Sequence, residues 1–341
     1  MQQVTLKTIS DKSQWESFLS KRAEVNFLQS WYWGDFHVSL GNTIRRVGFF
    51  RGEKLEGVML SVVEPAKRGR YLTVPAGPIM DFNDMDLVRA FEAEIKQQAR
   101  ELNCVFVRVR PPLEKNEFSQ KLFFALGFVN APIHLHAELT SQLALTPSED
   151  ELLANMRKAT RYEIKKGINE GIKIITSQNA EDIKKFYDLQ IQTSKRQNFV
   201  PFSYKFFYEQ FKVFASANNA LLYSAELNGQ LLAMGFIIFY GQEAAYHYGA
   251  STEEGRKHPG AYLIQWEAIK EAKRRGLKRY NFWGVTHEHE KNHRFYRLSI
   301  FKRGFGGKDL EYLHAQDLVI NKWRYMINLI VEKLRKRIRR V

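Results

Sequence analysis

Residues 220–240 read ALLYSAEL-NG-QLLAMGFIIFY, two apolar runs separated by Asn228-Gly229. Asn-Gly is the dipeptide most typical of a two-residue β-hairpin, because both residues accept a left-handed backbone at little cost. The stretch therefore predicts two antiparallel strands, at residues 220–226 and 231–240. The elements expected after this hairpin are a strand, a helix and a strand, at residues 244–250, 262–275 and 279–283.

The same order of elements is expected about 175 residues earlier in the chain. Residues 44–63 alternate as two strands joined at Arg51-Gly52-Glu53-Lys54, and helical periodicity runs through residues 84–102. A strand at 104–109 follows, then a helix at 117–126 and a strand near 133–139. Strand, turn, strand, helix, strand thus occurs twice, which predicts a mixed α/β protein of two related domains.

The composition is that of a folded, basic protein. The 341 residues include 44% hydrophobic and 13% aromatic residues, and 52 Lys and Arg against 37 Asp and Glu give a net charge of +15. Such an excess favours polyanionic partners, namely nucleic acid, anionic lipid or phosphorylated substrates. The chain exceeds the usual size of one hydrophobic core, so two domains are again expected.

The single cysteine and the N-terminus indicate a cytoplasmic protein. Cys104 lies in an apolar run that is typical of a buried strand, so we interpret it as an inert core residue. The first residues contain no apolar signal core, and no run of 18 apolar residues occurs.

Residues 301–307, Phe-Lys-Arg-Gly-Phe-Gly-Gly, are the best candidate for a functional site. Glycines allow the backbone to approach a ligand closely, and Lys302 is a mobile charge suited to a phosphate or a developing oxyanion. The alternative is a hairpin turn with a solvated lysine.

Two helices carry the densest positive charge. In residues 156–166, four cations share one broad face that suits a phosphate backbone, although such a face is often merely solvated; they are Arg157, Lys158, Arg161 and Lys165. Residues 321–341 place Trp323, Met326, Ile327, Ile330, Leu334 and Ile338 on one stripe. This helix packs on the first domain or lies at an anionic membrane surface; we expect packing for its first half and electrostatic contact for residues 335–340.

His287, His289 and His293 have spacings that suit metal ligands, but they lie in a polar stretch with Glu288 and Glu290. A solvated loop explains this pattern better, so we expect no metal and no cofactor.

Four segments together resemble the FemABX peptidoglycan-bridge aminoacyltransferases, over nearly the whole chain. They are Gln29-Ser30-Trp31-x-Trp33-Gly34, Met156-Arg157-x-x-Thr160-Arg161-Tyr162, Tyr262-Leu263-x-Gln265-Trp266-Glu267-Ala268-Ile269 and Phe301-Lys302-x-Gly304-Phe305-Gly306-Gly307. The resemblance implies two tandem GNAT-like domains with a C-terminal segment that returns to the first. We expect one domain at residues 1–142 with 308–341 and the other at 143–307. No long heptad run occurs between residues 160 and 300, as in the branch that lacks a helical arm.

The resemblance also implies a reaction and its partners. Family members transfer an amino acid from aminoacyl-tRNA to an amine on the stem peptide of a peptidoglycan precursor, which is UDP-linked or lipid-linked. Both substrates are polyanions, which suits the positive charge. We expect a cytoplasmic monomer, with contact to an anionic membrane through the C-terminal helix.

Site residues are implied position by position. Phe301 and Lys302 match a pair that assists transfer at the acceptor end of the tRNA, where Arg303 and the four cations of residues 157–165 would bind RNA. Tyr248 matches a tyrosine of the precursor site, to which Trp33 is also assigned. A phosphate-binding lysine of the family falls at Asp35 or His37, and an arginine falls at Phe202, for which Arg196 is a substitute. Arg110 stands where some relatives carry an acidic residue.

Aminolysis of the tRNA ester needs orientation, stabilisation of the oxyanion and a proton for the departing ribose oxygen. We expect direct transfer without a covalent enzyme intermediate, so Cys104 is dispensable. One alternative is an acyl-CoA-dependent N-acyltransferase with residues 255–261 as a pyrophosphate turn. The other is a nonenzymatic basic protein that binds RNA or membrane.

Overall fold

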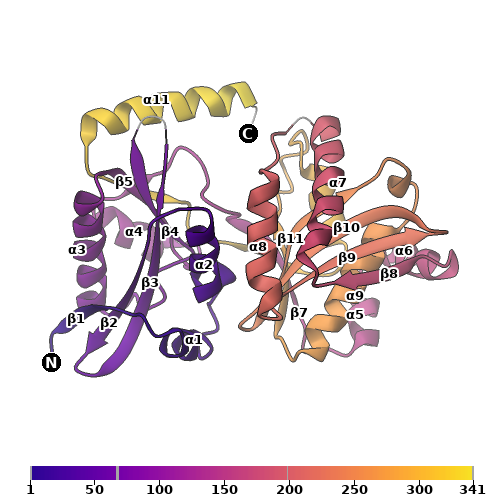
Figure 1. Cartoon of the computed structure of the whole chain (residues 1–341), viewed down its shortest axis with the longest axis horizontal. Helices are drawn as coiled ribbons and strands as arrows, with labels where there is room; N and C mark the ends of the chain where they lie inside the picture. Colours follow the sequence, from indigo (N-terminus) through magenta and orange to yellow (C-terminus); the bar gives the residue numbers. More distant parts are fainter. Residues whose placement is uncertain (1, 67–68, 198, 340–341) are drawn as a thin grey trace. The chain divides into compact units, whose positions relative to one another are not determined.

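The computed structural model describes residues 2–66, 69–197 and 199–339, with side chains up to residue 332. The chain folds into two compact units (Figure 1). Unit 1 consists of residues 1–138 and 311–341, and unit 2 consists of residues 139–310. The chain therefore crosses between the units twice, after residue 138 and after residue 310.

Unit 1 is built on a seven-stranded sheet with the order β1-β2-β3-β4-β5-β14-β6. Its strands are β1 (Val4–Thr8), β2 (Ile44–Arg51), β3 (Lys54–Glu64), β4 (Arg70–Pro75), β5 (Cys104–Arg110), β6 (Val129–Asn130) and β14 (Gln316–Val319). Its helices are α1 (Lys12–Leu19), the 3₁₀ turn η1 (Phe27–Gln29), α2 (Trp31–Ser39), α3 (Met85–Glu101), α4 (Glu117–Ala125) and α11 (Lys322–Arg339).

Unit 2 has a second seven-stranded sheet, with the order β8-β9-β10-β11-β12-β7-β13. Its strands are β7 (Leu139–Ala144), β8 (Lys173–Ser177), β9 (Ala220–Leu227), β10 (Gln230–Tyr240), β11 (Glu243–Ser251), β12 (Arg279–Gly284) and β13 (Lys308–Glu311). Its helical segments are α5 (Glu149–Asn155), α6 (Lys158–Asn169), η2 (Ala180–Asp182), α7 (Ile183–Gln197), α8 (Tyr204–Ser216), η3 (Glu254–Arg256), α9 (Gly260–Arg274) and α10 (Tyr296–Arg303).

The two sheets share one plan. In each, the fourth and fifth strands are parallel, β4 with β5 and β11 with β12. The sixth strand comes from elsewhere in the sequence: β14 arrives from the C-terminal segment in unit 1, and β7 precedes all other strands of unit 2. The C-terminal segment thus returns to the first unit, as expected.

Local sequence explains the elements that were predicted. Asn228 and Gly229 both have positive φ, of 52° and 78°, and join β9 to β10 as the dipeptide predicted. The side chain of Asp84 accepts hydrogen bonds from the first amides of α3. Phe91 and Ile95 of α3 are fully buried on the sheet of unit 1, and burial of each such side chain stabilises the fold by about 1.5–3 kcal/mol.

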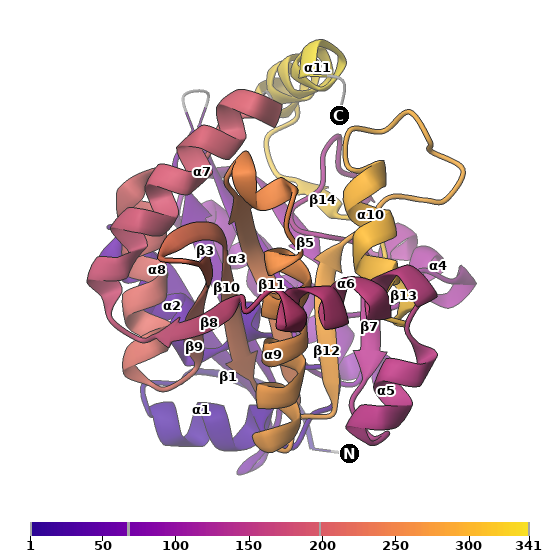
Figure 2. The same cartoon turned by 90° about the vertical axis from the view of Figure 1, so that its right-hand side faces the viewer.

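Helices cover both faces of the sheet in unit 2. A Cβ added at Gly235 of β10 would lie 2.9 Å from Ile264 of α9, whereas the ring of the next residue, Phe236, lies 5.1 Å from that of Phe211 in α8. Successive side chains on a strand point to opposite faces. Helices α9 and α8 therefore pack on opposite faces, and Figure 2 shows α9 lying over the strands.

Two expectations from the sequence are wrong. Residues 133–138 form no strand, because His134 and Glu138 engage each other and His314 instead. In α11 the apolar stripe does not pack on unit 1. Its described members are exposed, and they are Trp323 at 86%, Met326 at 50%, Ile327 at 56% and Ile330 at 54%.

The face of α11 that does pack on unit 1 is amphipathic rather than apolar. The Tyr325 hydroxyl donates to Asp317 at 2.9 Å, its ring contacts Phe106, and Asn328 is buried beside it. Leu329 packs on the same cluster and Glu332 pairs with Arg108 at 3.0 Å, so this face docks through both polar and apolar contacts. The cationic residues 335–340 lie outside the part of the chain whose side chains are described.

Candidate active site

The parallel strands of unit 2 separate towards their carboxyl ends. Strands β11 and β12 pair at only three positions, the last being Ala245 with Asn281. Beyond that point β11 carries a bulge at His247, since Tyr246 faces Ile237 of β10 and Tyr248 faces Phe236. In β12, Trp283 has a left-handed backbone with φ of 65°. Bulges and unusual backbone conformations re-aim side chains and are common near active sites.

Lys302 of α10 reaches this opening. Its Nζ donates a hydrogen bond of 2.7 Å to the carbonyl of Gly284, the last residue of β12, and lies 5.9 Å from the ring centre of Tyr246. The side chain is buried, and no carboxylate of the described residues lies within ion-pair distance of it. Burial lowers the pKa of Lys302 to about 7. The alternative of a solvated lysine in a hairpin turn is therefore wrong.

Helix α10 is fixed along the segment that follows β12. Ser299 Oγ accepts a 2.9 Å hydrogen bond from the Thr286 amide, and Arg303 donates to the Thr286 carbonyl at 2.5 Å. The ring of Phe301 packs edge-on against Tyr262, at 4.8 Å between ring centres, and joins the hydrophobic core. Phe301 thus anchors the helix that presents Lys302.

The glycines of residues 304–307 allow a close approach of α10 to α6 and β7. A Cβ at Gly304 would lie 2.4 Å from Thr160 Oγ1, and one at Gly307 would lie 3.1 Å from the backbone of Gln142. The Arg157 amide donates to the Gly304 carbonyl at 2.9 Å. The sequence analysis predicted that these glycines let the backbone approach a ligand. In the structure they instead let α10 pack closely on α6 and β7.

The five cations predicted to bind RNA differ in exposure and in whether another group already binds them. Arg157, Lys158 and Lys165 are exposed on α6. Arg161 instead donates to the carbonyls at the end of α5, including that of Met156 at 2.7 Å. Arg303 pairs with Asp309 at 2.6 Å.

Tyr248 lies in β11, and Arg196 of α7 contacts the end of that strand. The Tyr248 ring is 5.0 Å from that of Phe207 and 3.9 Å from that of His247, and burial raises the pKa of its hydroxyl. Burial also lowers the pKa of His247 to about 3, so this imidazole is neutral at pH 7. Arg196 donates to the Ser251 carbonyl at 2.8 Å, at the end of the strand.

His37 and Trp33 belong to α2 of unit 1. Both are buried, with 5.1 Å between their ring centres. The Asn42 amide lies 3.0 Å from His37 Nδ1, and burial lowers the pKa of His37 to about 4. A neutral, buried imidazole is a poor replacement for a phosphate-binding lysine.

Sequence reasoning missed Tyr246 as a neighbour of Lys302, and it missed the contact between His247 and Trp283, whose ring centres lie 5.3 Å apart. The sequence features that could have indicated these residues are the aromatic run 246–248 at the end of a strand and the aromatic residue before Gly284.

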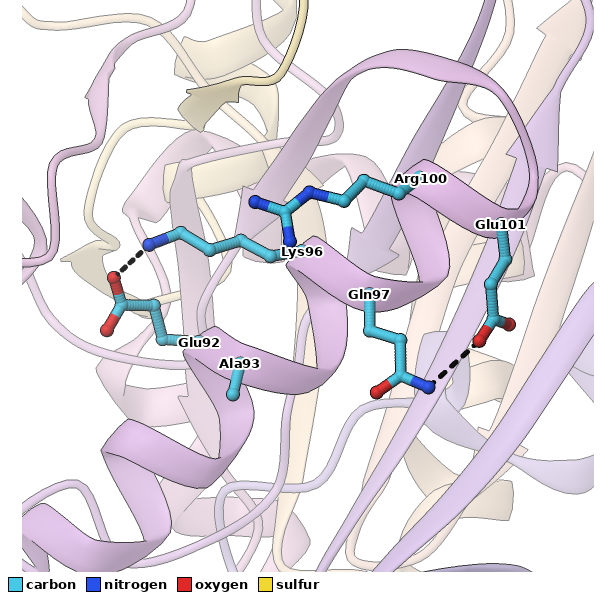
Figure 3. A pocket seen from close by; sticks show the side chains of 6 residues that line it. All are labelled: Glu92, Ala93, Lys96, Gln97, Arg100 and Glu101. Carbon is cyan, nitrogen blue, oxygen red and sulfur yellow. Dashed lines mark hydrogen bonds and ion pairs between the residues drawn. The ribbon is translucent and has the colours of Figure 1, made fainter.

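A hollow over α3 in unit 1 is a separate feature (Figure 3). There Lys96 pairs with Glu92 at 2.5 Å and Gln97 with Glu101 at 2.9 Å, so these groups satisfy one another along the helix.

A family model described as the FemAB family matches residues 10–124, 129–231 and 228–333. The chain belongs to the FemAB family. The expected resemblance is thereby confirmed. Aminoacyltransferase FemA of Staphylococcus epidermidis is 22% identical over 83% of this chain and 88% of the relative. Lipid II:glycine glycyltransferase of the same species is 20% identical over 95% of this chain and 94% of the relative.

Solved structures confirm the fold. The crystal structure of FemX has a TM-score of 0.86 at 17% identity, covering 95% of this chain and all of that one, 100%. A tandem GNAT protein from the clavulanic acid biosynthesis pathway has a TM-score of 0.59 at 13% identity, with coverages of 93% and 98%. Two tandem GNAT-like domains are therefore the fold. Among the described residues, no helix is both long and apolar enough to cross a bilayer.

Proposed function

We propose that this FemAB family member transfers an amino acid from aminoacyl-tRNA to an amine on the stem peptide of a peptidoglycan precursor. The observation that carries the proposal is Lys302, a buried amine at the opening of β11 and β12. The relatives support the reaction class, since they are aminoacyltransferases and a glycyltransferase that acts on lipid II. The acceptor is either lipid-linked or UDP-linked.

Lys302 moves the proton that the reaction requires. The acceptor amine attacks the ester carbonyl, a C–N bond forms, and the carbonyl oxygen takes up negative charge. When the C–O bond to the ribose breaks, the Lys302 ammonium gives a proton to the departing oxygen, and the new amide nitrogen returns one. A pKa of about 7 makes both steps accessible at neutral pH.

Orientation supplies the rest of the acceleration. The ester is already activated, and a well-oriented intramolecular reaction gains roughly 7–11 kcal/mol. The partly exposed rings of Tyr246 and Tyr248 flank the bulge at His247 on opposite faces of the sheet, because they pair with Ile237 and Phe236. We assign the acceptor peptide to the Tyr248 face, with Arg196 at its far end, so that its amine reaches Lys302 through the opening between β11 and β12.

The start of α6 supports binding of the tRNA. The exposed cations Arg157 and Lys158 stand at the first turn of a helix whose N-cap has no side-chain hydrogen bond. Helix N-termini attract phosphate groups through free amides and the helix dipole, so we assign an acceptor-end phosphate to this turn.

The exposed apolar residues of helix α11 support the proposal that it contacts an anionic membrane. Trp323, Met326, Ile327 and Ile330 are exposed opposite the face that docks on unit 1. The sequence flanks this stripe with cations such as Lys322 and Arg324. Such a helix lies in the plane of a bilayer surface. This contact would hold the enzyme beside a lipid-linked acceptor.

The test is transfer of radiolabelled amino acids from a total charged-tRNA pool to lysine-containing muramyl-pentapeptide precursors, UDP-linked and lipid-linked. We expect label on the precursor in the native protein, none after RNase, and much less with Lys302→Met. Label from acyl-CoA without dependence on tRNA would favour the acyl-CoA alternative. For that alternative the glycine signal is weak, because a Cβ at Gly255 would lie 1.9 Å from the Leu232 carbonyl oxygen, so packing explains this glycine.

A further inference from the structure

Three side chains with metal-binding atoms converge in unit 1, next to the two points where the chain changes units. His134 precedes β7, Glu138 is the last residue before it, and His314 lies between β13 and β14. His134 Nδ1 and His314 Nδ1 lie 2.6 Å and 2.7 Å from the same oxygen, Glu138 Oε2. The three candidate ligand atoms all lie within 4.8 Å of one another.

The hydrogen bonds around the cluster fix how His314 is protonated. Its Nε2 lies 2.7 Å from the carbonyl oxygen of Ala131, which can only accept, so Nε2 carries a hydrogen. In a neutral ring Nδ1 then has a lone pair, and that lone pair faces a carboxylate oxygen of Glu138. Two lone pairs at this distance repel each other, and either a shared proton at this distance or a metal ion bound to both atoms after they move apart removes the repulsion.

The surroundings also orient the carboxylate. Glu138 is 9% exposed, and its Oε1 accepts a 2.8 Å hydrogen bond from the Ala315 amide. Within the described residues its ion pairs are with the two histidines alone. An oriented carboxylate therefore faces two imidazoles.

We propose that His134, Glu138 and His314 bind a divalent transition-metal ion, with zinc as the best fit. Two imidazoles and one carboxylate form a ligand set that zinc uses when a water molecule completes the site. A carbonyl that holds the second N–H of a ligating histidine, as Ala131 does for His314, is the usual support of such a ligand. His134 is 58% exposed, which leaves room for water.

The ion would fasten the returning C-terminal segment to the segment before β7. His314 is 176 residues from Glu138, so one ion would hold together two passages of the chain that are distant in sequence. The expectation of no metal rested on His287, His289 and His293, which form a different group. The rings of His287 and His289 stack at 5.3 Å, and the group of possible metal ligands found among the described residues does not include them. They provide a matched control.

The experiment uses the full chain after removal of metal with a chelator, titrated with Co²⁺ and then with Zn²⁺. We expect about one Co²⁺ per chain, a visible absorption typical of low coordination number, displacement by Zn²⁺ and a rise in melting temperature with either ion. His134→Asn should lose all four signals, and because this residue is mostly exposed the variant should fold. His287→Asn/His289→Asn should keep them.

A second variant, His314→Asn, removes the buried ligand. Loss of Co²⁺ binding with native circular dichroism would support the site in the same way as His134→Asn. The proposal is overturned if the native protein takes up no more Co²⁺ than His134→Asn, or if the double variant in the control group abolishes uptake. In either case a proton on His314 is what holds Glu138.

Discussion

The parallel strand pairs of the two units share one position in the sheet and differ in how far they remain paired. In unit 1, β4 and β5 stay together to Pro75 and Arg110 at the end of the strands. In unit 2, β11 and β12 part after Ala245 and Asn281. The first pair is closed by backbone hydrogen bonds, whereas the second separates beside partly exposed aromatic rings and the buried Lys302.

A buried cation lies near each strand pair, and the surroundings shift the pKa values of the two cations in opposite directions. Arg108 of β5 binds Asp317 through two hydrogen bonds of 2.7 and 2.8 Å, and Glu332 at 3.0 Å. Burial alone would lower the pKa of Arg108, but these carboxylates raise it. Lys302 has a carbonyl partner instead, and burial lowers its pKa to about 7. The comparison teaches that one buried cation stabilises the fold and the other is held ready to exchange a proton.

The largest expected effect is on stability, from Arg108→Met. This change leaves the carboxylates of Asp317 and Glu332 without their cation, and breaking a buried ion pair costs about 3–5 kcal/mol. Urea unfolding of the full chain measures the loss. The control is Arg45→Met, which removes an exposed ion pair with Glu101 and should cost about 0–1 kcal/mol. Equal losses of stability in both variants would contradict the claim that the buried ion pairs of Arg108 stabilise the fold.

Lys302→Met should have the opposite outcome. Loss of one transition-state donor lowers the rate by about 10²–10³, while the apolar replacement relieves the cost of burying an amine. We expect transfer activity to fall by that factor with unfolding stability at pH 7 unchanged or raised. Phe124→Ala is the control, because Phe124 holds the penultimate position of α4 as Lys302 does in α10, yet it is 81% exposed. Full transfer activity in Lys302→Met would contradict the claim that Lys302 exchanges a proton in the reaction.

The pH dependence of stability should show the same contrast. The pKa of Lys302 is about 7 when folded and 10.5 ordinarily, so between these values the unfolded chain binds more protons. Stability contributed by this residue therefore rises with pH across that window and is lowest below it. Urea unfolding at both ends of the window should show this slope in the native protein and a smaller slope in Lys302→Met. Identical slopes would mean that Lys302 is not buried as described.

Cys104→Ala is expected to have the smallest effect. The thiol begins the closed strand β5, and burial raises its pKa to about 11, so it is protonated at neutral pH. Turnover should be unchanged, and stability should fall by about 1 kcal/mol, as for an average core substitution. A folded variant without turnover would contradict direct transfer and assign a covalent role to unit 1.

Sequence alone predicted the parts of the fold that depend on local signals. Asn228-Gly229 determined a hairpin, Gly276 ended a helix, and the repeated order of elements predicted two related units. Lys302 was found because a cation among glycines is unusual. Its burial was not predicted, since it depends on the distance from Nζ to a carbonyl of another element.

The remaining features depend on contacts between distant segments. Periodicity predicted an apolar docking face for α11, but the opposite face packs on unit 1 through the contacts of Tyr325, Leu329 and Glu332. The group of His134, Glu138 and His314 joins two segments whose spacing has no metal-binding pattern. Strand pairing at the first crossing likewise moves residues 139–144 to the other sheet.

The origin of the sixth strand has a consequence for biosynthesis. Every strand of the unit 2 sheet falls within residues 139–311, so that sheet needs no strand from the last segment of the chain. In unit 1, β5 pairs with β14, which is synthesised about 200 residues later. Until then the nascent chain carries an unpaired edge strand, which is a template for aggregation. The unit that begins first is the one that finishes last, and a ribosome that stalls before residue 316 releases a chain with one complete sheet.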